Sequence, residues 1–88
     1  MKVHVKLFAT LVRSVPQALL AHHPQGIRSG IPIEVELAGG STLADLLVYL
    51  RLPPEEVKLI FVNGRAQEEG YHLSDGDQVG IFPPVGGG

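Results

Sequence analysis

The chain has 88 residues, 44% of them apolar, and a formal net charge of −2, which suit one domain with one small core. Scattered Lys and Arg argue against a nucleic-acid-binding face, and no membrane-spanning run or signal peptide is seen, so we expect no membrane association and a cytoplasmic location. The absence of cysteine excludes disulfides, thiolate nucleophiles and cysteine-based zinc sites.

Residues 2–8 predict a half-buried β-strand. The apolar residues Val3, Val5 and Leu7 alternate with a largely charged face. Phe8 is an aromatic residue on that charged face. Its ring either covers the sheet edge or contacts a partner protein.

Residues 9–30 show the least regular pattern. A short helix can begin at Thr10, and Pro16 can start a second helical turn. Residues 22–26 are typical of a loop.

Residues 31–37 alternate again and predict a second strand. Pro32 fits best near the strand start or on a sheet edge. The residues that we expect to face inward are Ile31, Ile33, Val35 and Leu37.

The clearest predicted helix follows Gly39-Gly40. Ser41 or Thr42 can cap it, and Asp45 in the first turn favours the positive end of the helix dipole. We expect Pro53-Pro54 to end it. Its apolar residues, spaced i, i+3, i+4 and i+7, are Leu43, Leu46, Leu47 and Leu50, which predict a buried stripe.

Residues 58–62 predict a third strand that is apolar on both faces and ends in the turn Asn63-Gly64. A single helix covers only one face of a small sheet. Either Leu59 and Phe61 or Ile60 and Val62 must therefore point away from the helix, and some apolar surface should stay open.

The last part of the domain holds a possible short strand in residues 65–70 and a turn in residues 73–77. Asp75 and Asp77 are expected to shape that turn. Residues 78–82 predict the last strand. A mixed sheet covered by one main helix is an α+β fold.

The first and last strands each carry an outward phenylalanine, Phe8 and Phe82. If these strands are neighbours, the two rings meet. Together with one face of the third strand they would form an apolar patch of the kind used in protein–protein contacts.

The chain ends in Phe82-Pro83-Pro84-Val85-Gly86-Gly87-Gly88. The prolines favour a stiff, extended exit, and the glycines allow close approach of the backbone to another molecule. Residues 83–88 would reach about 20 Å at roughly 3.3–3.6 Å each. We expect them to form a flexible tail, beyond a domain of residues 1–82, that enters a neighbouring protein. The alternative is a merely disordered end or a cloning remnant.

Several segments together carry a family resemblance. They are Val5–Leu11, Gly40–Leu43, Val62–Gly64, Leu73–Asp77 and Phe82–Gly88. In this order they resemble the β-grasp, ubiquitin-like fold, and within it the MoaD/ThiS family of sulfur carriers. The Phe-Ala-Thr-Leu opening and the Phe-Pro-Pro-Val ending look most like MoaD, the small subunits of molybdopterin synthases.

The resemblance implies a carrier that is not an enzyme by itself and holds no cofactor or metal. An E1-like adenylyltransferase would use ATP to adenylate Gly88, the partner of Gly87 in the terminal diglycine. A sulfur donor protein would then supply the sulfur of a thiocarboxylate, and a MoaE-like large subunit would receive the tail. The partner interface implied by the resemblance consists of Phe8, Phe82, Pro83, Pro84, Val85 and Gly86.

Three other functions remain open from the sequence. The triple glycine resembles some ThiS proteins, the carriers for thiamine thiazole synthesis. A ubiquitin-like protein modifier would use the same adenylation, and a β-grasp interaction module would need no tail chemistry.

The remaining polar residues predict no catalytic site. The histidines, among them His22-His23, lack metal-ligand spacing and are expected on the surface. The pairs Glu55-Glu56 and Glu68-Glu69 are typical of a solvated face, although they could also steer a basic partner.

Overall fold

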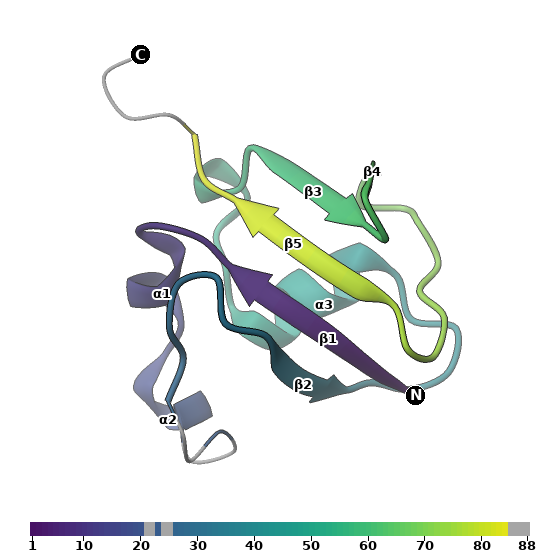
Figure 1. Ribbon diagram of the computed structural model, residues 1–88, viewed down its shortest axis with the longest axis horizontal. Coiled ribbons are helices and arrows are strands. Elements are labelled where there is room, and N and C mark those ends of the chain that lie inside the picture. Colours follow the sequence, from purple (N-terminus) through teal and green to yellow (C-terminus); the bar gives the residue numbers. More distant parts are fainter. Residues whose placement is uncertain (21–22, 24–25, 85–88) are drawn as a thin grey trace.

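The computed structural model describes residues 1–20, 23 and 26–84. The elements follow in the order β1 (Lys2–Leu7), α1 (Leu11–Ser14), α2 (Gln17–Leu20), β2 (Ile33–Glu36), α3 (Leu43–Leu50), the 3-10 helix η1 (Pro54–Glu56), β3 (Leu59–Val62), β4 (Arg65–Ala66) and β5 (Gln78–Phe82) (Figure 1).

In the described part of the chain, the strands form a five-stranded sheet in the order β2-β1-β5-β3-β4. β1 and β5 run parallel, whereas the β1–β2, β3–β4 and β3–β5 pairs are antiparallel. The helix α3 lies across one face of this mixed sheet (Figure 1). The arrangement confirms the predicted α+β, β-grasp fold.

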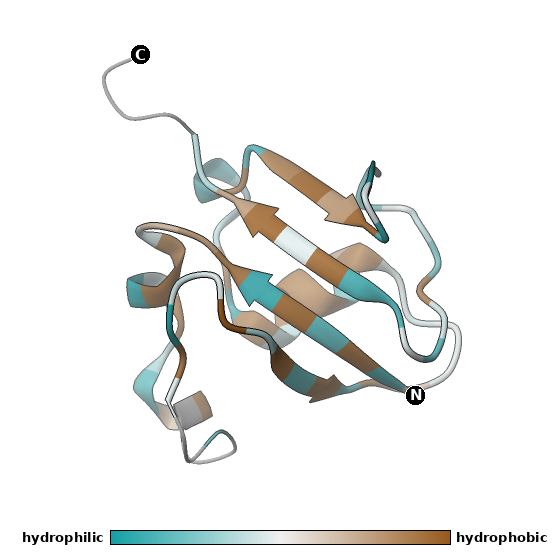
Figure 2. Ribbon diagram, in the orientation of Figure 1, coloured by the Kyte–Doolittle hydropathy of each residue, from teal (hydrophilic) through white to brown (hydrophobic). Residues whose placement is uncertain are grey.

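The core lies between the sheet and α3. Val3, Val5 and Leu7 on β1 are buried, as their alternation predicts, and Figure 2 shows this alternation along the strand. Burying each large aliphatic side chain contributes roughly 1.5–3 kcal/mol. The predicted stripe of α3 is confirmed in full, since the buried residues of that helix are Leu43, Leu46, Leu47 and Leu50.

The start of α3 is fixed by a capping box between Thr42 and Asp45. The Thr42 N–H donates to Asp45 Oδ2 at 2.8 Å, and the Asp45 N–H donates to Thr42 Oγ1 at 3.3 Å. Each bond satisfies a backbone donor that a helix start otherwise leaves free. Of the two predicted caps, Thr42 is therefore the one that is used.

The end of α3 differs from the prediction. The helix stops at Leu50, before the prolines, because Arg51 adopts a left-handed conformation with φ 54°. Its N–H donates to the carbonyls of Leu47 and Val48. Pro53 thus follows a helix that has already ended.

The second strand is shorter than predicted, and the inward position expected for Ile31 is wrong. Ile31 is 57% exposed, because its N–H donates to the Arg28 carbonyl in a turn before the strand begins. Pro32 precedes β2, as expected for a residue without an N–H. Ile33 and Val35 are buried.

The irregular segment between β1 and β2 contains the two predicted short helices, α1 and α2. The loop predicted for residues 22–26 falls largely outside the described residues. In the described ranges, no helix has the length and apolar character needed to cross a membrane.

Candidate functional site

An aromatic cluster of Phe8, Phe61 and Phe82 lies on the sheet face opposite α3. The parallel pairing of β1 with β5 sets Leu7 opposite Ile81, so the next residues along, Phe8 and Phe82, are neighbours. Their rings stack with centroids 4.3 Å apart and planes 4° from parallel. The prediction that these two rings meet is confirmed, although their role in partner binding remains a prediction.

The third ring joins from β3. Phe61 meets Phe82 edge-on, with ring centroids 5.7 Å apart and planes at 84°. Offset-stacked and edge-to-face pairs each contribute roughly 0.5–1.5 kcal/mol beyond the area that they bury. The cluster is therefore a fixed surface feature rather than three independent side chains.

The two faces of β3 are now assigned. Ile60 and Val62 are buried against the core, whereas Leu59 is 42% exposed and Phe61 is half-buried on the open face. Apolar surface therefore remains uncovered beside the aromatic cluster, as predicted from a strand that is apolar on both sides.

An open groove of about 500 Å³ adjoins the aromatic cluster. It runs from Phe8 and Phe82 at one end to His4, Gln78 and Asn63 at the other. Its lining is mostly apolar at the cluster end and polar at the far end. Such a hollow can accept a side chain of a partner protein.

The chain leaves the sheet beside the cluster. The Phe8 N–H donates to the Ile81 carbonyl at 3.2 Å, and the Lys58 N–H donates to the Phe82 carbonyl at 2.8 Å. The backbone is thus held from both sides up to Phe82. Pro83, which has no N–H, then ends the hydrogen-bond ladder.

Of the predicted tail residues, Pro83 is half-buried and Pro84 is exposed. They leave β5 at the end of the sheet where β1 also ends (Figure 1). The predicted partner residues Val85 and Gly86 and the predicted reactive residues Gly87 and Gly88 lie outside the described residues.

A buried carboxylate fixes the far end of the groove. Asp77, which is 7% exposed, accepts a bond from Asn63 Nδ2 at 2.9 Å and one from the Ser74 N–H at 2.8 Å. The Gln78 N–H in turn donates to Asn63 Oδ1 at 3.0 Å. The expected turn role of Asp77 therefore extends to joining the β3–β4 turn to the start of β5.

The β3–β4 turn itself follows the sequence. Asn63 and Gly64 have φ values of 51° and 85°, the left-handed pair that tight hairpins favour. The Asn-Gly pair predicts this turn from the sequence, whereas the bond between Asn63 and Asp77 joins two turns and is a finding of the structure. The available signal was an Asn-Gly turn followed by an Asp-Gly-Asp turn at the ends of adjacent strands.

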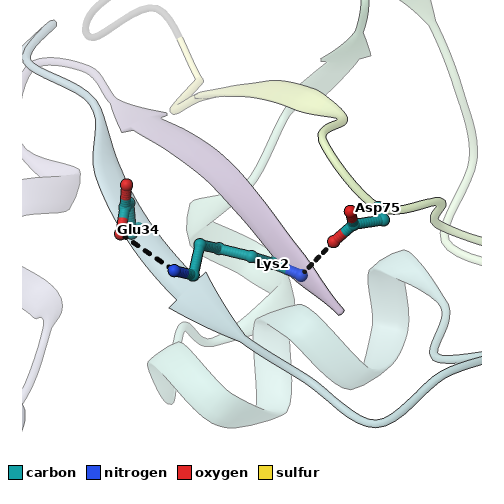
Figure 3. A network of polar contacts seen from close by, with 3 residues as sticks. All are labelled: Lys2, Glu34 and Asp75. Carbon is teal, nitrogen blue, oxygen red and sulfur yellow. Dashed lines mark hydrogen bonds and ion pairs between the residues drawn. The ribbon is translucent and has the colours of Figure 1, made fainter.

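The open face also carries charged side chains around Lys2. Lys2 Nζ lies 3.7 Å from Glu34 Oε2, and the Lys2 N–H donates to Asp75 Oδ1 at 2.8 Å (Figure 3). These side chains are exposed, so the ion pair contributes little to stability. In the described residues, no group of three or more His, Cys, Asp or Glu side chains could hold a metal ion.

Comparisons with known proteins place this geometry in context. The profile of the ThiS family matches residues 5–88. None of the curated proteins matches the chain. Among solved structures, a putative molybdopterin converting factor, subunit 1, from Pyrococcus furiosus is 30% identical with a TM-score of 0.67, covering 97% of this chain and 99% of that one.

Two further solved structures share the fold at lower identity. Small archaeal modifier protein 1 of H. volcanii is 24% identical with a TM-score of 0.66, covering 96% of this chain and 98% of its own. The third is the complex of subunits 1 and 2 of the molybdopterin-converting factor from Helicobacter pylori 26695, where the match is 20% identical with a TM-score of 0.58 and covers 100% of both chains.

Proposed function

The chain belongs to the ThiS family, and we propose that it is a sulfur carrier whose Gly88 carboxylate becomes a thiocarboxylate for molybdopterin synthesis. The observation that carries this proposal is that the family match extends through the glycine-rich segment to residue 88. The likeness to a putative molybdopterin converting factor subunit at 30% identity supports the choice of pathway.

The chemistry suits a glycine carboxylate. A carboxylate is a poor electrophile until one oxygen becomes a leaving group. In the proposed first step, an oxygen of the Gly88 carboxylate attacks the α-phosphorus of ATP on an E1-like adenylyltransferase, and pyrophosphate leaves. Sulfide derived from a sulfur donor protein then attacks the carbonyl carbon, AMP leaves, and the thiocarboxylate remains.

The chain's own part in this reaction is to carry and present the tail. The carrier contributes no cofactor, and ATP is bound by the activating enzyme. We propose that the carrier and the activating enzyme are both cytoplasmic. A MoaE-like large subunit would then receive the tail and perform the transfer of sulfur to the pterin precursor. In this proposal the small subunit is not an enzyme by itself.

The geometry beside the exit supports this division of roles. The backbone is anchored up to Phe82, and six residues follow it. An extended segment of six residues reaches about 20 Å. A partner that binds the aromatic cluster and the adjoining Pro83-Pro84 could therefore receive Gly87-Gly88 in its own buried active site.

Mass spectrometry tests the proposal directly. The protein is incubated with the adenylating enzyme of the same organism, ATP and a sulfur donor, and its intact mass is measured. We expect an increase that matches the replacement of one oxygen by sulfur, located on the peptide that contains Gly88. An unchanged mass, with an enzyme active on another carrier, would contradict the proposal.

Two alternatives use the same adenylated glycine. A carrier for thiamine thiazole synthesis would deliver the sulfur to a thiazole synthase in place of a MoaE-like subunit. A protein modifier would form an isopeptide bond, and Gly88 joined to lysines of target proteins in cell extract would identify it. Assaying sulfur transfer from the thiocarboxylate form to a MoaE-like subunit and to a thiazole synthase separates the two sulfur pathways.

A further inference from the structure

Asn63 is the single asparagine of the chain, and Gly64 follows it directly. An asparagine before a glycine is prone to cyclise, because the glycine has no Cβ to shield its backbone nitrogen. Both residues are exposed. Among the described residues beyond its two chain neighbours, none has an atom within 4 Å of the position that a Cβ on Gly64 would take. Water therefore has access to the peptide bond between Asn63 and Gly64.

The side-chain amide of Asn63 is held away from Gly64 by two hydrogen bonds, which we call the Asn63 lock. Nδ2 of Asn63 donates to Asp77 Oδ1 at 2.9 Å, and Oδ1 accepts from the Gln78 N–H at 3.0 Å. Cyclisation requires Asn63 Cγ to swing onto the Gly64 nitrogen. Because both polar atoms of the planar amide are bound to the segment that begins β5, the lock must open before the ring can close.

We propose that Asn63 is a site of spontaneous deamidation, which the lock slows and whose product cannot form the lock again. The Gly64 nitrogen, after losing its proton, attacks Asn63 Cγ. The bond from Cγ to Nδ2 breaks, and Nδ2 leaves as ammonia. Water then opens the resulting succinimide at either carbonyl and gives aspartate or isoaspartate. One water molecule is consumed for each ammonia released, and no other reagent is required.

The product sets a second carboxylate against Asp77. Asp77 is 7% exposed, and its two oxygens accept from Asn63 Nδ2 and from the Ser74 N–H. An aspartate at position 63 has no N–H to donate from its side chain and repels the carboxylate that it faces. The bond between the β3–β4 turn and the start of β5 is therefore lost irreversibly. The reaction limits the lifetime of the native fold, and the inference is independent of the proposed function.

The test follows deamidation in the purified full-length protein. The protein is incubated in a mildly alkaline buffer, and peptide mass spectrometry with peptide separation measures asparagine, aspartate and isoaspartate at position 63. Asp77→Ala removes one bond of the lock. Leu46→Ala is the control for a general loss of stability, because Leu46 is fully buried beneath α3 and lies outside the turn. Asn63→Gly tolerates the φ of 51° and has no amide to lose.

We expect Asp77→Ala to accelerate deamidation about tenfold relative to wild type. Leu46→Ala should accelerate it by less than about twofold, because the turn opens locally far more often than the whole chain unfolds. In concentrated urea, where the lock is absent, wild type and Asp77→Ala should react at the same rate. The product should contain isoaspartate as well as aspartate, since the succinimide opens at both carbonyls, and Asn63→Gly should show no mass change in this peptide.

An Asn63→Asp variant tests the consequence of the reaction, because it reproduces one of the two products. Its thermal unfolding midpoint should lie about 5–10 °C below that of wild type. The inference would be overturned by an unchanged midpoint of this variant, by equal acceleration in Leu46→Ala and Asp77→Ala, or by a wild-type chain that reacts as fast when folded as in urea. Each of these outcomes leaves the proposed function untouched.

Discussion

The side-chain amide of Asn63 donates a 2.9 Å hydrogen bond to the buried carboxylate of Asp77, linking the β3–β4 turn to the turn before β5. The two residues hold the polar end of the groove in place. The carboxylate also accepts a bond from the Ser74 N–H, so both of its oxygens are used.

Asp77→Ala should therefore destabilise the protein by about 2–3 kcal/mol, because hydrogen bonds to a charged group are lost and their donors are left without a partner. Urea unfolding followed by circular dichroism measures this change. The control is Asp75→Ala, which removes one exposed bond to the Lys2 N–H. Equal losses of stability in the two variants would show that the burial of Asp77 does not increase the contribution of its hydrogen bonds to the free energy of unfolding.

The second prediction concerns the contribution of the Thr42 cap of α3 to the free energy of unfolding. Thr42→Ala removes the side-chain acceptor of the capping box and should lower the free energy of unfolding by about 1 kcal/mol. Ser41 is the matched control, because its hydroxyl donates to the Ala38 carbonyl outside the helix. A loss at Ser41→Ala as large as that at Thr42→Ala would argue against the assigned cap.

The left-handed residue that ends α3 predicts a stabilising change. Arg51→Gly should raise the free energy of unfolding by about 0.5–1 kcal/mol, since glycine adopts a positive φ without the Cβ clash. Gly64→Ala is the opposite control: the φ of Gly64 is 85°, and in the described part of the chain no atom beyond its two chain neighbours lies within 4 Å of the added Cβ. It should destabilise through backbone strain alone, and a stabilised Gly64→Ala would refute this reasoning.

The stacked rings predict a coupling between two distant segments of the sequence. A double-mutant cycle with Phe8→Ala and Phe82→Ala should yield an interaction energy of about 0.5–1.5 kcal/mol in the free energy of unfolding. The same single variants should weaken binding to the adenylating enzyme, measured by calorimetry. Val48→Ala, at a residue of α3 that is 75% exposed, serves as the control and should leave binding unchanged.

Much of this fold follows from periodicity in the sequence. The alternation in β1 and the leucine spacing in α3 each belong to one element that buries the same face along its whole length. The pattern alone therefore assigns the buried face. The stacking of Phe8 on Phe82 needed one further assumption, that the first and last strands are neighbours.

Other features depend on contacts between segments and could not be predicted in this way. Ile31 continues the alternation of its strand, yet a turn at Arg28 exposes it. The groove around Gly80 requires the register of β1 and β3 against β5, which no local pattern specifies. The sequence predicts that Pro53-Pro54 ends α3, because prolines are strong helix breakers. The left-handed conformation of Arg51, which ends the helix at Leu50, has no comparable signal in the sequence.

The interior position of β5 has a mechanical consequence. The strand that carries the tail is hydrogen-bonded on both sides, to β1 and to β3. A pull on the tail along the strand axis therefore loads both ladders in shear, so that many bonds must break together rather than one after another. A force applied to the chain beyond Phe82 would therefore have to break both ladders at once to detach the last strand from the sheet.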